Sequence, residues 1–445
     1  MPLWDLPPQL SAWVVQLALV LDARVQHRLT TLVVGLLFAR GRRTVTSWLR
    51  AAGVGADFRP YYYLLATLGR QADWIARLLL LRVAVPVLLG RLDRLLFGLD
   101  DTPTPRYGPK VQGAGIHHNP TPGPAGEKFL YGHVWVTLAW LARHPLWHTL
   151  ALPLSALLYV RARDVPKLAQ EYPWTFRTKL ELAVELVRDV VGWVGRTGQA
   201  LWIAVDGAYA KRPFLRPVLA LGLVVVSRLR RDADLRDVPP ATRRPGRRGP
   251  LPTYGQARID LAKRAGQKRG WQSVRCVQYG REVVKAVKTF VATWRPAGGR
   301  IRVVIVREPD GWLPYFCTKP EATAAEVLEA MADRGAIEQT FKDVKEVWGA
   351  GQQQVRNVYA SVGAFVVNLL LYSVVEAWAW GRAEEGLVDR SRSPWDAEER
   401  RPSHADKRKA LQGEILRDEI RAVMGPRAEQ EGFRDLTRRL LDLAA

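Results

Sequence analysis

The chain has 445 residues, 48% of them hydrophobic and 24% charged, so it is long enough for two or three domains with real cores. Its 66 Lys and Arg residues against 43 acids give a net charge of +23, which favours a polyanionic partner such as a nucleic acid or a membrane surface. The two cysteines, Cys276 and Cys317, exclude a disulfide framework and a cysteine-based metal site, and the N-terminus has no signal-peptide pattern, so a cytoplasmic protein is expected.

The first 90 residues are predicted to be helical. The segment 42–54 has the pattern of a short helix closed by glycine, and 61–81 that of a longer amphipathic helix. Arg side chains on small helical units suit docking to DNA, and a plain helical cap on the next domain is the alternative. The apolar stretches 12–38 and 75–98 are interrupted by charges well short of about 18 clean residues, which favours buried elements over membrane spans.

An alternation of strand-like and helical patterns follows. Several runs are apolar and rich in β-branched and aromatic residues, and two of the short ones end in an aspartate. This order predicts a mixed, partly parallel α/β sheet of the RNase H-like kind. The expected elements are strands at 94–100, 129–142 and 146–162, a helix at 175–195, a strand at 201–206, a helix near 211–221 and a strand at 221–229.

Most of the excess positive charge lies in the segment 228–302. It holds 20 Lys and Arg residues but five acids, a net charge of +15. Strand-like runs with Trp271, Tyr279 and Trp294 interleaved argue against a loose basic tail, because such a tail would lack β-branched residues. A β-rich insertion that faces DNA and ends in a further hairpin is therefore predicted, and a solvated basic hairpin without a partner is the alternative.

Two helices are expected after the insertion. A long helix with a good N-terminal pattern is predicted at 321–349. The segment 361–380 is apolar and long enough to cross a bilayer, but Asn368 and Glu376 interrupt it, so a buried helix is the preferred interpretation.

The end of the chain has mixed charge and is expected to be partly disordered, with a last amphipathic helix near 432–443. The predicted division of the chain has five parts: a helical, DNA-binding N-terminal region at 1–90, the first part of an RNase H-like core at 91–235, a basic β-strand insertion at 236–318, the last helices of the core at 319–380, and a mixed-charge tail at 381–445.

Two aspartates carry the first indication of chemistry. Asp100 and Asp206 each follow a short apolar strand, where the core holds the backbone rigid and the side chain reaches the sheet edge. A single aspartate at such a place more often caps a turn, but two on neighbouring strands are better evidence for a site. Asp101 would point to the other side of an extended strand, so it remains an alternative to Asp100.

The third element of the candidate site is a helix face. At 100° per residue, Arg334, Glu338, Phe341 and Lys345 lie within one narrow sector. On an isolated helix this pattern would be an ordinary salt-bridge pattern. Next to two strand aspartates, Glu338 can complete an oxygen cage for Mg²⁺, while Arg334 and Lys345 reach phosphates.

These residues lie in three segments that resemble the acidic motifs of bacterial insertion-sequence transposases of the Asp-Asp-Glu (DDE) type. The third motif of related families reads Tyr, two residues, Arg, three residues, Glu, six residues, Lys. Arg334, Glu338 and Lys345 have these spacings, whereas Met331 stands at the Tyr position, which puts one DNA contact in doubt. The resemblance covers roughly residues 90–380, and its segments are FGLDDT at 97–102, AVDGAYAKRPFL at 204–215 and DRGAIEQTFKDVKEVWGAGQQQVR at 333–356.

The resemblance implies metal-dependent cleavage of transposon ends and strand transfer into target DNA. Asp100, Asp206 and Glu338 would hold two Mg²⁺ ions, with Mn²⁺ as a substitute. The expected partners are double-stranded DNA, as terminal inverted repeats and target, and a second copy of the chain in the synaptic complex, at the bacterial nucleoid and without a membrane. The residues expected to contact DNA are Arg334, Lys345, Lys211 and Arg212, with Trp271 and Trp294 as stacking platforms for a flipped base.

Three alternatives compete with this interpretation. The first is a decayed or repurposed transposase that only binds DNA, and the intact acids and cations argue against it. The second is another RNase H-like DNA nuclease such as a junction resolvase, and the basic insertion argues against it. The third is a basic membrane-associated protein, which the apolar segments 75–98 and 361–380 would suggest.

Overall fold

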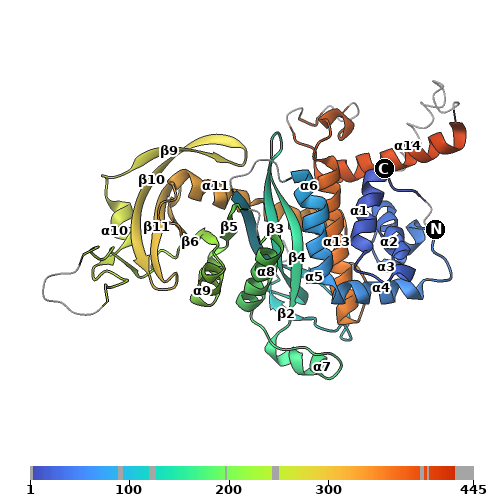
Figure 1. Ribbon diagram of the computed structural model, residues 1–445, viewed down its shortest axis with the longest axis horizontal. Helices are drawn as coiled ribbons and strands as arrows, with labels where there is room; N and C mark the ends of the chain where they lie inside the picture. Colours follow the sequence, from blue (N-terminus) through green and yellow to red (C-terminus); the bar gives the residue numbers. More distant parts are fainter. Residues whose placement is uncertain are drawn as a thin grey trace.

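The sheet at the centre of the protein is built on five strands, which follow one another along the chain as predicted from the sequence (Figure 1). The computed structural model describes residues 4–88, 94–119, 127–195, 198–242, 250–390, 395–397 and 400–425. The five strands are β1 (Arg94–Pro105), β3 (Phe129–His144), β4 (His148–Tyr159), β5 (Ala200–Val205) and β6 (Val224–Arg228).

The directions of these strands identify the fold class. β3 is antiparallel to β1 and β4, whereas β5 is parallel to both β1 and β6. The short β2 (Gly115–His118) pairs with the beginning of β3. A meander of three strands joined to two parallel strands in the order β4-β3-β1-β5-β6 is the RNase H-like arrangement, so the predicted mixed α/β fold is confirmed.

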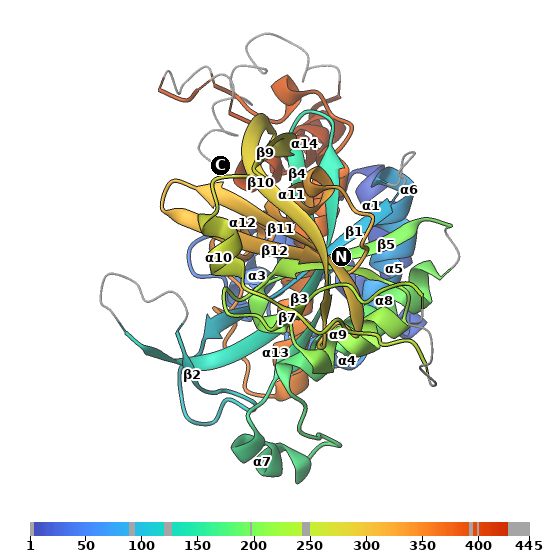
Figure 2. The same ribbon diagram turned by 90° about the vertical axis from the view of Figure 1, so that its left-hand side faces the viewer.

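Two helical layers cover the two faces of the sheet (Figure 2). The side chains along β1 point alternately to one layer and to the other. Phe97 and Leu99 pack into the core of one layer, whereas Leu96 packs into that of the other. Thr178 and Glu181 form a capping box at the start of α8. The first layer holds α8 (Lys179–Val194) and α9 (Arg212–Ala220), and the second holds α11 (Ala324–Arg334), α12 (Ala336–Glu346) and α13 (Val358–Ala379).

The predicted β insertion continues the same sheet instead of forming a separate one. β12 pairs antiparallel with β6, and the sheet reaches twelve strands. In Figure 1 the insertion lies at the opposite end of the molecule from the N-terminal helices. Its elements are β7 (Leu235–Arg236), β8 (Arg258–Ile259), α10 (Leu261–Gly266), β9 (Gln272–Gln278), β10 (Arg281–Trp294), β11 (Gly299–Glu308) and β12 (Gly311–Cys317).

The N-terminal region is helical, as predicted, and packs around α13. Helix α4 crosses α13 so closely that a Cβ at Gly69 would lie 1.9 Å from the carbonyl oxygen of Tyr359, and one at Gly363 would lie 1.9 Å from that of Leu65. The elements here are α1 (Pro8–Ala18), α2 (His27–Phe38), α3 (Val45–Ala51), α4 (Arg59–Arg70), α5 (Ala72–Leu78), the π-helical Leu79–Ala84 and α6 (Val85–Leu88); a short α7 (Val165–Ala169) follows β4.

Helix α13 has the length and composition of a membrane span, but 94% of its most apolar window is buried inside the protein. This burial agrees with the interpretation of 361–380 as a core helix.

The last part of the chain differs from the expected elements at two places. The long helix expected at 321–349 is two helices that meet at Gly335. The N–H of Gly335 bonds to the carbonyl oxygen of Ala332, three residues earlier, at 3.0 Å, so the regular α-helical pattern is interrupted there. The expected tail contains α14 (His404–Met424), which buries charged side chains as well as Leu411 and Ile415 and so shows little hydrophobic periodicity. The helix expected near 432–443 lies outside the described residues.

Candidate active site

Asp100 and Asp206 directly follow the paired residues Leu99 and Val205 on the parallel strands β1 and β5. Both continue the alternation that faces α11 and α12. The carboxylate of Asp206 also accepts a hydrogen bond from the N–H of Ala208 at 3.3 Å, which caps a short 3₁₀ turn. The two aspartates predicted from the strand ends are therefore neighbours on one face of the sheet.

Asp101 has its contacts on the opposite side of the sheet, with the layer that contains α8. Its carboxylate accepts hydrogen bonds from the Lys179 ammonium at 2.7 Å and from the Tyr209 hydroxyl at 3.2 Å. Burial, together with the carboxylate of Asp101, raises the pKa of Tyr209 well above its ordinary value, so this hydroxyl keeps its proton and remains a donor. Asp100 and Asp101 thus belong to different surroundings, and only Asp100 shares a face with α12.

Arg334 joins Asp100 to Glu338. Its Nη1 lies 2.7 Å from Oδ2 of Asp100, and its Nη2 lies 3.3 Å from Oε1 of Glu338. The Arg334 side chain is 14% exposed, whereas that of Glu338 is 68% exposed. Burial raises the pKa of Asp100 above its ordinary value, although the Arg334 guanidinium opposes the shift. Arg334 and Glu338 are four residues apart, so they lie about one helical turn apart and in contact across Gly335.

The three carboxylates fit a divalent cation by their donor chemistry, since Mg²⁺ prefers carboxylate oxygens plus waters. Asp206 and Glu338 each make one of the polar contacts described above, which leaves oxygen lone pairs available. As the side chains lie, the described residues contain no group of three or more His, Cys, Asp or Glu gathered as a metal site. Arg334 instead bridges two of the three acids.

The other predicted DNA contacts lie in different surroundings. Lys211 and Arg212 are exposed at the start of α9, shortly after Asp206. Lys345 lines a cavity beside Tyr107, and burial lowers its pKa. These cations are placed where phosphates could reach them, but the structure brings them into no contact with the three acids.

The two tryptophans of the insertion differ from the expectation. Trp294 is 7% exposed and packs edge-to-face against Phe316 with 5.0 Å between ring centroids, so it fills the core and cannot stack on a base. The Trp271 ring lies under the cations of Lys288 and Arg307, at 4.9 and 4.4 Å, and is partly buried. Trp294 is therefore part of the small β core of the insertion.

An exposed aromatic residue of the insertion that the sequence analysis did not name as a DNA contact lies near the candidate site. Tyr279 forms the turn between β9 and β10 with φ of 50°, and it is 75% exposed. A Cβ added at Gly335 would lie 3.2 Å from its ring, so the hairpin tip reaches the junction of α11 and α12. The Tyr-Gly pair between two strand patterns was the available signal for this turn.

Comparison with known proteins gives one family. A family model described as DDE superfamily endonuclease matches residues 16–295, more than half of the chain. The matched range contains Asp100 and Asp206 but ends before Arg334 and Glu338. No curated protein matches the chain.

Proposed function

Since the chain belongs to the DDE superfamily endonucleases, we propose that it is a transposase that cleaves the ends of a transposon and joins them to target DNA. The family makes nuclease chemistry the activity and DNA the substrate, and its enzymes generally use divalent metals. The observation that carries the proposal is the placement of Asp100 and Asp206 on one sheet face, with Arg334 linking Asp100 to Glu338.

The proposed metal ligands are Asp100, Asp206 and Glu338. A pair of divalent ions, Mg²⁺ or Mn²⁺ in its place, would activate the attacking oxygen and stabilise the leaving oxygen. Arg334 opposes the effect of burial on the pKa of Asp100 and so favours the ionised carboxylate that a cation requires. Its planar guanidinium is also suited to bidentate contact with a phosphate.

The basic surfaces support a role in holding DNA. The cations Lys211, Arg212 and Lys345 would position strands electrostatically without reading their sequence. The insertion carries most of the excess charge and joins the catalytic sheet through β12, so it would bind the transposon end close to the acids. A homodimer is proposed because two ends must be paired, with the bacterial nucleoid as the place of action.

The test uses a matched set of variants on a labelled duplex that carries the inverted repeats flanking the gene. Asp100→Asn, Asp206→Asn and Glu338→Gln should each reduce Mg²⁺-dependent cleavage by at least about 10³-fold while binding is retained. Asp101→Asn is the matched control and should cleave at nearly the wild-type rate. Cleavage by Asp100→Asn together with loss in Asp101→Asn would reverse the assignment of the first acid.

Two further results separate the proposal from its alternatives. A pre-cleaved end incubated with plasmid should give joined products, whereas hydrolysis without joining would favour another RNase H-like nuclease. Wild-type protein that binds the end duplex but does not cleave it, whichever divalent metal is added, would favour a decayed transposase that acts only by binding.

A further inference from the structure

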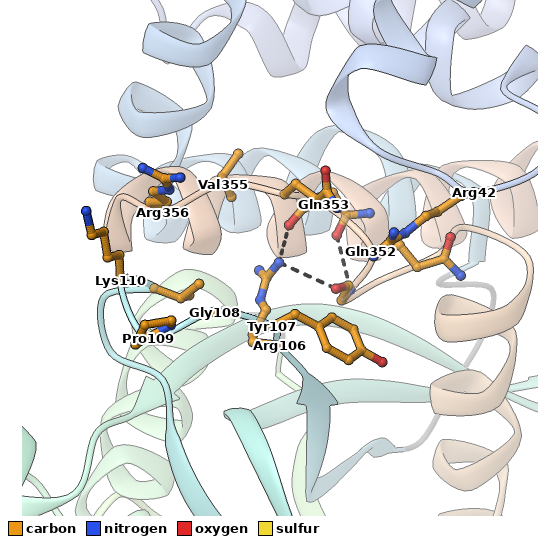
Figure 3. Close-up of a pocket in the computed structure, with 13 residues that line it drawn as sticks. Arg42, Arg106, Tyr107, Gly108, Pro109, Lys110, Gln352, Gln353, Val355 and Arg356 are labelled. Atoms are coloured by element: carbon orange, nitrogen blue, oxygen red, sulfur yellow. Dashed lines mark hydrogen bonds between the residues drawn. The ribbon is translucent and has the colours of Figure 1, made fainter.

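Two adjoining cavities form a groove near the loops that follow β1 and α12, and Figure 3 shows the residues that line the first of them. The first measures about 550 Å³ and lies between the loop 106–111 after β1 and the loop 351–356 after α12. The second measures about 850 Å³ and extends to Lys345 on α12. Both are lined by Arg42 and Tyr107, so they are parts of one surface, which we call the basic groove.

The lining of the basic groove contains cations and amides but no carboxylate. Arg42, Lys110 and Arg356 are exposed there, and none of them forms an ion pair with any residue that the structure describes. In Figure 3 Lys110 and Arg356 lie together at one end and Arg42 at the other. A concave surface with cations and no acid favours an anionic ligand.

Arg106 adds a buried positive charge to the floor of the groove. It is 6% exposed, and its Nε donates to Nδ1 of His133 at 3.1 Å, while Nη1 donates to the carbonyl oxygens of Gln353 and Gly351. Burial lowers the pKa of Arg106 to about 10 and that of His133 to about 3, so at neutral pH the guanidinium is charged and the imidazole is not. No described carboxylate neutralises Arg106, and an anion in the groove would reduce the free-energy cost of its burial.

The groove begins where the elements of the candidate site end. Strand β1 leads from Asp100 to Pro105, directly before Arg106, and α12 leads from Glu338 to Lys345. Six residues of extended strand span roughly 20 Å. A DNA strand advances about 3.4 Å per nucleotide, so this distance corresponds to about six nucleotides.

We propose that the basic groove holds the backbone of a DNA strand about six nucleotides from the scissile phosphate. Lys110, Arg356 and Arg42 contact its phosphates, and the ring of Tyr107, 77% exposed, stacks on a base. The inference rests on the proposed function, because it takes the scissile phosphate to lie at Asp100.

The first experiment measures affinity for the end duplex against salt concentration, by fluorescence anisotropy in EDTA with the full chain. The slope of log K against log salt is negative, and the double variant Lys110→Ala, Arg356→Ala should make it less steep by about 2. Each lost phosphate contact removes about 0.9 from the magnitude of the slope. Arg188→Ala removes an exposed cation from α8, on the other face of the sheet, and should leave the slope within about 1 of the wild-type value. An unchanged slope in the double variant overturns the proposal.

The second experiment locates the contact. The modified duplex carries neutral methylphosphonate linkages about six nucleotides from the cleavage position. Wild-type protein should bind this duplex more weakly than the unmodified duplex, whereas the double variant should bind the two duplexes equally. Equal losses for both proteins would place the contact elsewhere and overturn the proposal. Tyr107→Phe should keep the wild-type affinity and Tyr107→Ala should lose about tenfold, as expected for a stacked base.

Failure of this inference is distinguishable from failure of the proposed function. Wild-type protein that cleaves the end duplex while the groove variants bind normally refutes the groove alone. Wild-type protein that neither binds nor cleaves the end duplex refutes both.

Discussion

A buried charge network between α13 and α14 offers a quantitative test of the structure. Glu376 on α13 is 1% exposed and lies 2.5 Å from the Lys407 ammonium and 2.6 Å from Nδ1 of His404. The indole N–H of Trp348 donates to Nε2 of His404 at 2.7 Å, which requires that nitrogen to carry no proton. His404 therefore donates to Glu376 through Nδ1, and the Lys407 ammonium is the cation paired with that carboxylate.

The pKa of Glu376 sets the expected magnitude. Burial raises it, but Lys407 and the hydrogen bond from His404 outweigh burial and lower it from 4.5 to about 2. The folded protein therefore holds the carboxylate ionised where the unfolded chain would protonate it. This contributes about 3 kcal/mol to the free energy of unfolding above pH 4.5, which is lost as the pH falls toward 2.

Lys407→Met should lower the free energy of unfolding at pH 7 by about 3–5 kcal/mol, because it leaves a buried carboxylate without its cation. The sign of the pH dependence should also reverse. Without Lys407, burial places the folded pKa of Glu376 above the unfolded value, so the variant should be more stable at pH 5 than at pH 7.

Urea unfolding followed by circular dichroism at pH 5 and pH 7 measures both effects. The double variant Glu376→Gln, Lys407→Met carries neither charge and should recover most of the loss. Lys409→Met, an exposed position on the same helix, should change stability by less than about 0.5 kcal/mol. A loss below about 1 kcal/mol in Lys407→Met, or a double variant as unstable as the single one, would refute the reasoning.

Gly363→Ala would place a Cβ 1.9 Å from the carbonyl oxygen of Leu65, so it should push α4 away from α13 and lower the free energy of unfolding by about 1–3 kcal/mol; an unchanged melting temperature would contradict this close crossing. Lys179→Ala removes a half-exposed ion pair with Asp101 and should cost no more than about 1 kcal/mol, with cleavage retained; loss of cleavage would point to Asp101 as the first acid. Tyr279→Gly should raise stability by about 1 kcal/mol because glycine accepts the left-handed backbone, while end-duplex affinity falls if the exposed ring contacts DNA; normal affinity would remove Tyr279 from the DNA surface.

The elements of the core could be predicted from the sequence because each depends on local pattern. Apolar runs marked β1, β3, β4, β5 and β6, and helical periodicity marked α8 and α9. Helix α14 could not be found in this way, because its buried face is made of His404, Lys407 and Arg408 as well as two aliphatic residues. The hydrogen-bond and ion-pair partners of those side chains are distant in the chain, so the sequence pattern around α14 does not reveal them.

The candidate site shows the same division between local and distant information. The strand ends indicated Asp100 and Asp206, and strand alternation separated Asp100 from Asp101. The contact of Arg334 with Asp100 joins residues 234 positions apart, so helix spacing alone suggested a partner in Glu338 and missed the shorter bond. Trp294 was misplaced because alternation shows that a strand has two faces but not which face the neighbouring elements bury.

The continuity of the sheet between the strands that carry Asp100 and Asp206 and the insertion sets a geometric constraint on any DNA held there. One row of paired residues crosses the sheet from Leu99 through Val205, Ser227 and Phe316 to Val303. Asp100 and Asp206 stand one residue beyond its first two members. A row of backbone hydrogen bonds does not hinge, so the insertion and the carboxylates keep a constant separation. The distance along the DNA between the cleavage position and the place where the insertion holds the strand would then be fixed by the sheet.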